Sequence, residues 1–363
     1  PGIYYYDGAA WTVVSKKGWN LNGNGGTDPL TDFIGTKDAQ PLTFKVNNAK
    51  AGYIDYDNIK ASTAFGYQSL LSNTTGTQNS AFGYQSLSTN TGGFANAAFG
   101  NQSLLLNTTG YQNTALGFGA LRVNTSGYNN TATGLGALYL NTTGNSNTGY
   151  GYSSLASNTT GNNNTAVGNL AMLSNTKGYS NVAMGVSALS SNTIKSNLVA
   201  VGDSALYNNG KNLINESDAT ANTAIGSKSL FSNTAGAFNT ATGFNTLRDN
   251  TTGSSNTAVG WSALLHNING LRNTATGAGS LDHNIDGNYN TANGSFTLGT
   301  NKAGSYNTAY GVQANYTNQN GSFNTSSGCF ALISNLSSDN TAVGYEAISA
   351  NINGDGNTAV GKQ

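Results

Sequence analysis

Apolar and polar residues recur along most of this chain at a fixed spacing. A short pattern, Asn-Thr-Ala-x-Gly, returns every 17 residues from Ser62 onward, with one 24-residue step from Gly202 to Gly226 and one 16-residue step from Gly328 to Gly344. The glycines that close the pattern are Gly66, Gly83, Gly100, Gly117, Gly134, Gly151, Gly168, Gly185, Gly202, Gly226, Gly243, Gly260, Gly277, Gly294, Gly311, Gly328, Gly344 and Gly361. A 17-residue unit is too short to bury its own apolar side, so the units must stack on one another as a solenoid.

Each unit carries one large and one small apolar position. Counted from the closing glycine as position 1, the consensus is Gly-x-x-Ala/Ser-Leu-x-x-Asn-Thr-Thr-Gly-x-x-Asn-Thr-Ala-x; we call the same position in successive units a column. Leu in column 5 and Ala in column 16 predict a thin core in which Leu fills the interior and Ala lets the opposite wall approach. The Asn-Thr-Ala-x-Gly segment predicts a short strand, with a rise of ~4.8 Å from coil to coil. For the Ala-Leu segment, a second strand and a single helical turn both remain open.

Polar columns mark the corners of the coil. Column 8 is Asn in every complete unit, and the first seven members are Asn73, Asn90, Asn107, Asn124, Asn141, Asn158 and Asn175. Asn tolerates left-handed backbone angles and can cap its own turn, and stacked Asn amides can bond the amides above and below as a ladder. Column 11 is mostly Gly, as in Gly76 and Gly93, which indicates a corner with positive φ. Column 14 is mostly Asn as well.

Columns 17 and 2 vary but stay apolar over long stretches, as in Phe65, Phe82, Tyr67 and Tyr84. A slim coil has few interior sites, so these extra apolar columns indicate contact between chains. A parallel bundle about one axis is the simplest arrangement. The sequence therefore predicts an all-β fold, a parallel β-solenoid of 17-residue coils, assembled as a homotrimer, with a single-chain solenoid as the alternative.

The start of the repeat at residue 62 divides the chain into two regions. Residues 62–363 form the repeat shaft, and residues 1–61 read as a non-repetitive β cap that covers the open first coil. Within the cap, residues 3–8, 10–14 and 41–46 read as strands, the first two around an Asp-Gly turn. The seven extra residues of the long step lie in or beside 209–218, and we interpret them as a surface loop, with a binding loop as the alternative. Pro1 and the unfinished last unit suggest that both ends come from a longer chain.

Composition narrows the classes of partner. Charged residues make up 8% of the chain and the formal net charge is zero. We therefore expect no electrostatic attraction of the surface to nucleic acid or to an anionic membrane. No apolar run approaches the ~20 residues of a membrane helix, and no signal peptide is visible. Disorder is excluded because the apolar positions keep strict register and aromatic residues reach 10%. Cys329 is the lone cysteine, so we expect a partly buried free thiol.

The sequence offers little chemistry for catalysis or metal binding. His266 and His283 share column 7 and should stack, but we find no carboxylate or thiol in register with them, apart from Asp282 beside one, so no metal site is expected. The 15 acidic residues are scattered, which argues against the paired carboxylates of a polysaccharide-cleaving enzyme. There is no aspartate column for calcium and no phosphate-binding loop. We therefore expect no enzyme activity and no cofactor.

The repeat resembles known fibre shafts. The segments 164–168 (Asn-Thr-Ala-Val-Gly) and 260–264 (Gly-Trp-Ser-Ala-Leu), joined through linkers such as 250–253 (Asn-Thr-Thr-Gly), resemble the β-roll repeats in heads of trimeric autotransporter adhesins. They are more similar still to repeat shafts of tail-fibre-like proteins from Bacteroidetes and their phages, as are the openings at 2–8 and 41–47. The resemblance implies a parallel homotrimer displayed outside a cell or on a virion. The autotransporter spacing is shorter, near 14 residues, so that coil shape need not carry over.

From these observations we expect an extracellular or virion fibre shaft that mediates attachment to a cell or glycan surface. Aromatic and amide side chains on the outer columns suit the faces and edges of sugars, and the candidate ligand surface comprises Tyr111, Tyr128, Tyr179 and Trp261. One alternative is a mechanical spacer or filament subunit without its own ligand. A second alternative is an ice-binding solenoid, because Thr recurs in columns 9, 10 and 15.

Overall fold

The computed structural model describes residues 4–6, 8–9, 11–13, 28, 30, 33–56, 60–211 and 218–362. Throughout these ranges the regular secondary structure is β-strand, without a helix. Near the N-terminus, β1 (Tyr4–Tyr6) and β2 (Trp11–Val13) form an antiparallel hairpin. The sequence predicted both of these strands.

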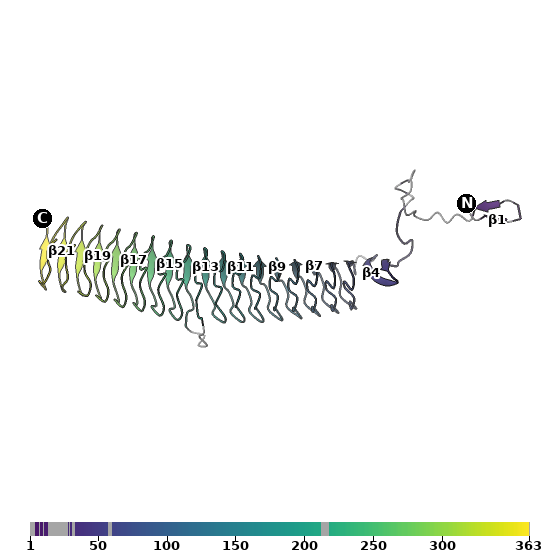
Figure 1. The fold of residues 1–363 in the computed structure, drawn as a ribbon, viewed down its shortest axis with the longest axis horizontal. Helices are drawn as coiled ribbons and strands as arrows, with labels where there is room; N and C mark the ends of the chain where they lie inside the picture. Colours follow the sequence, from purple (N-terminus) through teal and green to yellow (C-terminus); the bar gives the residue numbers. More distant parts are fainter. Residues whose placement is uncertain are drawn as a thin grey trace.

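From residue 62 onward the described chain is a long row of stacked coils, each with one short strand (Figure 1). The strands are β5 (Thr63–Phe65), β6 (Ser80–Phe82), β7 (Ala97–Phe99), β8 (Thr114–Leu116), β9 (Thr131–Thr133), β10 (Thr148–Tyr150), β11 (Thr165–Val167), β12 (Val182–Met184), β13 (Val199–Val201), β14 (Thr223–Ile225), β15 (Thr240–Thr242), β16 (Thr257–Val259), β17 (Thr274–Thr276), β18 (Thr291–Asn293), β19 (Thr308–Tyr310), β20 (Thr325–Ser327), β21 (Thr341–Val343) and β22 (Thr358–Val360). Each strand covers positions 15 to 17 and pairs in parallel with the strands of the coils before and after it. The pairing joins identical positions, as in Ala81 with Ala98. The protein is a parallel β-solenoid.

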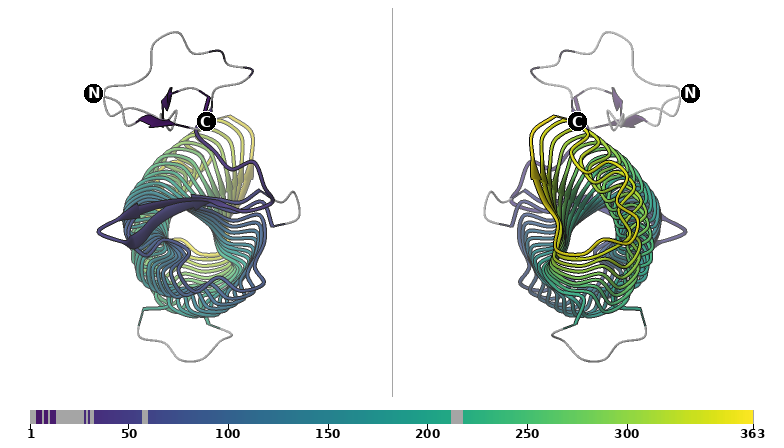
Figure 2. Two further views of the ribbon diagram at one scale, coloured as in Figure 1. Left: turned by 90° about the vertical axis from the view of Figure 1, so that its right-hand side faces the viewer. Right: turned by 90° about the vertical axis from the view of Figure 1, so that its left-hand side faces the viewer.

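The strand segment follows the alternation of its side chains. Position 16, the Ala column, points inward and is buried, whereas positions 15 and 17 point outward. Seen along the row, successive coils superimpose with a gradual rotation (Figure 2). The long step from Gly202 to Gly226 does not break the ladder, because Val199–Val201 pairs directly with Thr223–Ile225. Of the extra segment around 209–218, residues 212–217 lie outside the described residues.

The Ala-Leu segment is neither of the two elements left open by the sequence. It is a series of turns in which positions 3 and 5 take left-handed backbone angles, with φ of 55° at Gln85 and 50° at Leu87. The two N–H groups bond in opposite directions. Gln85 donates to the carbonyl of Tyr67 in the preceding coil, and Leu87 donates to the carbonyl of Ser103 in the next. A left-handed Leu is costly on its own, but here it secures contacts with both neighbouring coils and full burial of the side chain.

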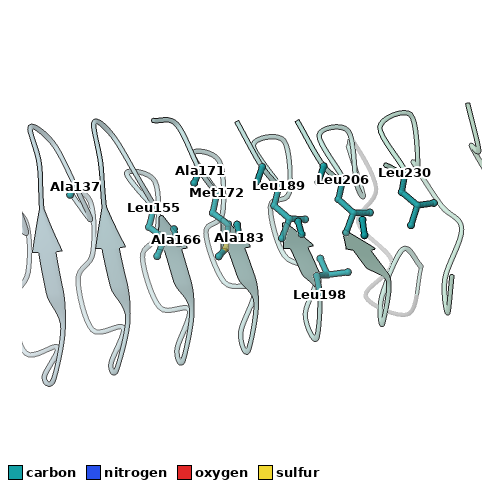
Figure 3. Packing of buried hydrophobic residues seen from close by; sticks show 14 of the residues in the cluster. Ala137, Leu155, Ala166, Ala171, Met172, Ala183, Leu189, Leu198, Leu206 and Leu230 are labelled. Carbon is teal, nitrogen blue, oxygen red and sulfur yellow. The ribbon is translucent and has the colours of Figure 1, made fainter. Parts of the chain in front are cut away.

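The core is the predicted pair of columns. The side chains of column 5 are buried from Leu70 to Leu332, with Met172 in place of Leu in one coil and the polar Asn315 in another, where the apolar core is divided into two clusters. The Ala side chains of column 16 are buried as well from Ala64 to Ala342, with Gly149 and Ser326 as the exceptions to Ala. Leu155, Met172, Leu189, Leu206 and Leu230 line up from coil to coil (Figure 3). Burying each large side chain is worth roughly 1.5–3 kcal/mol. Because each coil contributes so few of them, stability depends on the contact between neighbours.

A hairpin covers the first coil. It consists of β3 (Leu42–Val46) and β4 (Ala49–Ile54), and β4 pairs antiparallel with β5, so the edge of the first coil is not open. The dark purple hairpin crosses the near end of the coils in Figure 2, left. Tyr53 of β4 is buried against the core, and its hydroxyl is hydrogen-bonded to Asn73. Burial and the nearby charge of Asp55 raise the pKa of Tyr53 to about 12, although the bond to Asn73 opposes this shift.

Candidate functional site

The side chains of column 8 form a ladder inside the solenoid. Asn107 Nδ2 donates to Asn90 Oδ1 at 2.7 Å, and it also donates to the carbonyl of Gly110 in its own coil at 2.9 Å. The same two bonds recur at Asn90, Asn124, Asn141, Asn158 and Asn175. At Asn73, where the ladder begins, the bond within the coil is present, from Nδ2 to the carbonyl of Gly76. None of these residues has a positive φ, so the tolerance of Asn for left-handed backbone angles is not used here. The predicted cap of the turn is present as the bond to the carbonyl three residues further on.

A second ladder runs along column 14, and the sequence analysis assigned it no role. Asn96 Oδ1 accepts both the backbone N–H and the Nδ2 of Asn113, each at 3.1 Å. The Nδ2 of Asn96 also donates to the carbonyl of Gly110 in the next coil at 2.9 Å. The signal was present in the repeated Asn of this column. Together the two ladders satisfy buried polar groups that a thin core could not otherwise hold.

Glycine is required in column 11 for a reason other than the predicted one. Gly76, Gly93, Gly110 and Gly127 do not have positive φ, so the expected left-handed corner is wrong. A Cβ at Gly93 would overlap the carbonyl oxygen of Gly110 and the Oδ1 of Asn90. Glycine is required here because the next coil and the Asn ladder approach the backbone too closely for any side chain.

Both ladders are interrupted at the long step of the repeat, and the column 8 ladder is interrupted again at the short step. Leu198 replaces Asn in column 14 just before the long step, and Asn209 donates to Ala219 rather than to Asn192, whose buried Oδ1 has no partner among the described residues. At the short step, Asn335 donates to Asn315 at 3.4 Å, and the buried Oδ1 of Asn318 has no partner in the described part of the chain. The irregular steps are therefore local weak points in the bonding between coils.

The outer columns carry exposed aromatic and apolar side chains. In column 17, Phe65, Phe82 and Phe99 stack ring on ring, and in column 2 Tyr67 stacks on Tyr84. An apolar notch of about 290 Å³ opens beside column 2 near Phe118, Leu135 and Tyr139. It exists where Gly136 occupies position 3 and leaves space between these larger side chains.

The predicted ligand residues do not gather in one place. Tyr111, Tyr128 and Tyr179 belong to column 12, whereas Trp261, which is 55% exposed, belongs to column 2. Tyr111 is sandwiched between the rings of Phe94 and Tyr128, each with a centroid distance of 4.8 Å, so neither of its ring faces is open to a sugar. Tyr179 is 51% exposed. It lines a polar cavity of about 180 Å³ together with Lys177, Ile194, Ser196, Asn197 and Thr220.

The two histidines belong to a charged cluster that the sequence reading underestimated. Their ring centroids are 5.2 Å apart, so the two side chains are neighbours as expected, but the rings are tilted by 55° rather than stacked. A carboxylate does lie in register with them: Asp249, also in column 7, accepts from His266 Nδ1 at 2.7 Å and is paired with Arg248 at 2.8 Å. The statement that no such carboxylate exists was wrong, and the 17-residue spacing could have revealed it.

The pKa values of the two carboxyl groups in this cluster are shifted in opposite directions. Burial raises the pKa of Asp249, but hydrogen bonds from Arg248 and His266 outweigh burial, so the pKa lies below its ordinary value. Burial holds the pKa of Asp282 above its ordinary value, although His283 and His266 oppose the shift. Across the described ranges, no group of three or more His, Cys, Asp or Glu side chains could hold a metal ion.

Further searches add no relative. Comparisons with protein-family models, with curated proteins and with solved structures find no match for this chain. None of the described residues belongs to a helix long and apolar enough to cross a membrane. Cys329, partly buried, is a free thiol. The function of the chain is therefore inferred from the shape of the solenoid and from the side chains that its outer columns expose.

Proposed function

We propose that this chain is the shaft of an extracellular or virion fibre that mediates attachment to a cell or glycan surface, in the manner of the tail-fibre-like and adhesin shafts that its repeat resembles. The observation that carries the proposal is the unbroken parallel ladder from β5 to β22. Such a strand ladder gives a stiff rod that displays side chains of the same outer columns on every coil. Repeated weak contacts along a rod add up to firm attachment without any single deep site.

Self-association is part of the proposal. Columns 17 and 2 present exposed apolar and aromatic side chains in many coils, among them Leu116, Tyr150, Met184, Phe118 and Leu135, and repeated exposure of large apolar side chains on one side is typical of a protein–protein contact. A parallel homotrimer about one axis would cover these columns and leave columns 10, 12 and 13 facing solvent. Native mass spectrometry tests this arrangement: three chains support it, and a single chain at micromolar concentration contradicts it.

Attachment is tested by binding. The intact chain should be retained on a glycan array and on cells that display the retained glycans, and removal of those glycans by enzymes should release it. A mechanical spacer, the main alternative, would bind neither. We propose no catalytic step and no cofactor.

Ice binding remains a second candidate because of one column. Nine successive coils, from β14 to β22, carry Thr at position 15 on the outer side of the strand ladder. The neighbouring column 17 alternates there between residues such as Ile225, Thr242 and Tyr310, which makes the face uneven. A thermal-hysteresis assay separates the two candidates, since an attachment fibre should show none.

A further inference from the structure

The polar cavity beside Tyr179 is unlike the rest of the outer surface. It is lined by positions 10, 12 and 13 of three successive coils, namely Lys177, Tyr179, Ile194, Ser196, Asn197 and Thr220. It lies at the coils that lead into the long step of the repeat. Its volume of about 180 Å³ is below the ~300–1,000 Å³ of sites for drug-sized ligands, so it suits one small ring rather than a larger molecule.

The cavity exists because column 12 changes character here. Four coils earlier, Tyr111 is covered on both faces by neighbouring rings. The coil after Tyr179 instead carries Ser196, whose Oγ accepts the backbone N–H of Tyr179 at 3.0 Å, and the next carries Thr220. No aromatic ring of the described residues stacks on Tyr179, and its side chain is half exposed. A half-exposed phenol ring that borders a cavity beside short polar side chains is a typical platform for a sugar ring.

The charge of the cavity is positive. Lys177 is exposed at its rim and forms no ion pair within the described residues, and none of the six lining residues is acidic. Charged residues are rare in this chain, at 8%, so a lysine beside an open tyrosine face is not part of a general pattern. An ammonium group on a flexible stem favours a carboxylate ligand. The amide of Asn197 and the hydroxyl of Ser196 provide hydrogen-bonding groups of the kind that sugar hydroxyls need.

We propose that this cavity binds a single carboxylated sugar unit, such as a uronic acid within an acidic polysaccharide. The inference rests on the proposed function and names the class of glycan that one site on the shaft recognises. Lys177 pairs with the carboxylate, and the face of Tyr179 packs against the C–H groups of the ring. A neutral sugar would use the same ring face but would leave Lys177 without a partner.

The test uses the intact chain and two soluble probes, trigalacturonate and the neutral trisaccharide maltotriose, in calorimetric titrations. We expect binding of trigalacturonate only, weakening as salt is raised. Lys177→Gln and Tyr179→Ser should each weaken it at least about tenfold, the effect of losing one charge-assisted hydrogen bond or one ring contact. The matched controls are Lys302→Gln and Tyr306→Ser, which alter exposed residues of a distant coil and should leave affinity unchanged. All four changes are at exposed side chains, and thermal unfolding verifies that each variant folds.

The outcomes separate this inference from the proposed function. If trigalacturonate binds equally well to the Lys177 and Tyr179 variants, the cavity is not the site. If only neutral glycans bind, attachment to glycans is retained and the acidic class is wrong. If neither probe binds and a glycan array and cell-binding assay are also negative, the proposed function fails together with this inference.

Discussion

The side-chain amide of Asn107 donates to the side-chain oxygen of Asn90, 17 residues earlier in the chain, at 2.7 Å. The bond has the same direction in coil after coil: the later Asn donates and the earlier one accepts. Each interior Asn of the ladder is therefore a donor to one neighbour and an acceptor for the other. A change at one residue affects the bonding of the coils on both sides.

The first prediction concerns this ladder. Asn124→Ala removes the donor to Asn107 and the acceptor for Asn141, and it leaves buried polar groups unpaired in both coils. Each unpaired group should cost roughly 1–3 kcal/mol. Chemical denaturation should show this loss of unfolding free energy. Asn320→Ala, at an exposed position of column 10, is the control and should change stability little; equal effects of the two changes would contradict a structural role for the ladder.

A second prediction separates two adjacent glycines. Gly93→Ala should destabilise the protein strongly, because the new methyl group would overlap the carbonyl oxygen of Gly110 and the Oδ1 of Asn90. Gly92→Ala, one residue earlier, meets only Thr75 Oγ1 at 3.3 Å and should be nearly neutral. Thermal unfolding of the two variants provides the comparison. A neutral Gly93→Ala would mean that neighbouring coils are farther apart than described.

A third prediction concerns the interruption of the ladders. Between Asn192 and Asn209 both side-chain ladders are broken, and the Oδ1 of Asn192 is buried without a partner among the described residues. Local stability should be lowest there, because fewer bonds join the two coils. Hydrogen exchange should be faster for the amides of coils 185–226 than for those of coils 100–168. Uniform protection along the whole shaft would show that the interruption has no energetic consequence.

Much of this architecture could be read from the sequence because the period repeats the same information many times. The columns that contain Leu87 and Ala98 predicted the core, and the 17-residue spacing predicted which residues of neighbouring strands pair. What could not be read depends on close contact between coils. Leu87 takes a left-handed backbone that no local preference of Leu would suggest, and Gly93 is required by its neighbours rather than by its own φ.

The candidate site was predicted less well for a related reason. Tyr111 and Tyr179 occupy the same column and look equivalent in the sequence, yet one is covered by rings on both faces and the other borders a cavity. The difference comes from the residues one coil away, Tyr128 and Ser196. Reading each column down its length, rather than each unit along its sequence, would have distinguished them, and it would also have placed Asp249 beside His266.

A fourth prediction concerns pH. The pKa of Asp249 lies below its ordinary value because hydrogen bonds from Arg248 and His266 outweigh burial, so the ionised carboxylate stabilises the folded state. This contribution is present above the ordinary pKa of about 4 and is lost as the pH falls through the lower folded value. The difference in unfolding free energy between the wild type and Asp249→Asn should therefore be largest near neutral pH and shrink below about pH 4. Asp203→Asn, an exposed change, is the control; a difference that grows towards acid pH would contradict this account.

The most direct test of the whole account is a cryo-electron microscopy map of the intact chain. We predict a slender rod whose density repeats every ~4.8 Å along its axis, with the side chains of Asn90, Asn107 and Asn124 in one continuous interior column. A compact particle, or a rod in which residues 17 apart are not neighbours, would contradict the stacked solenoid and the functions inferred from it.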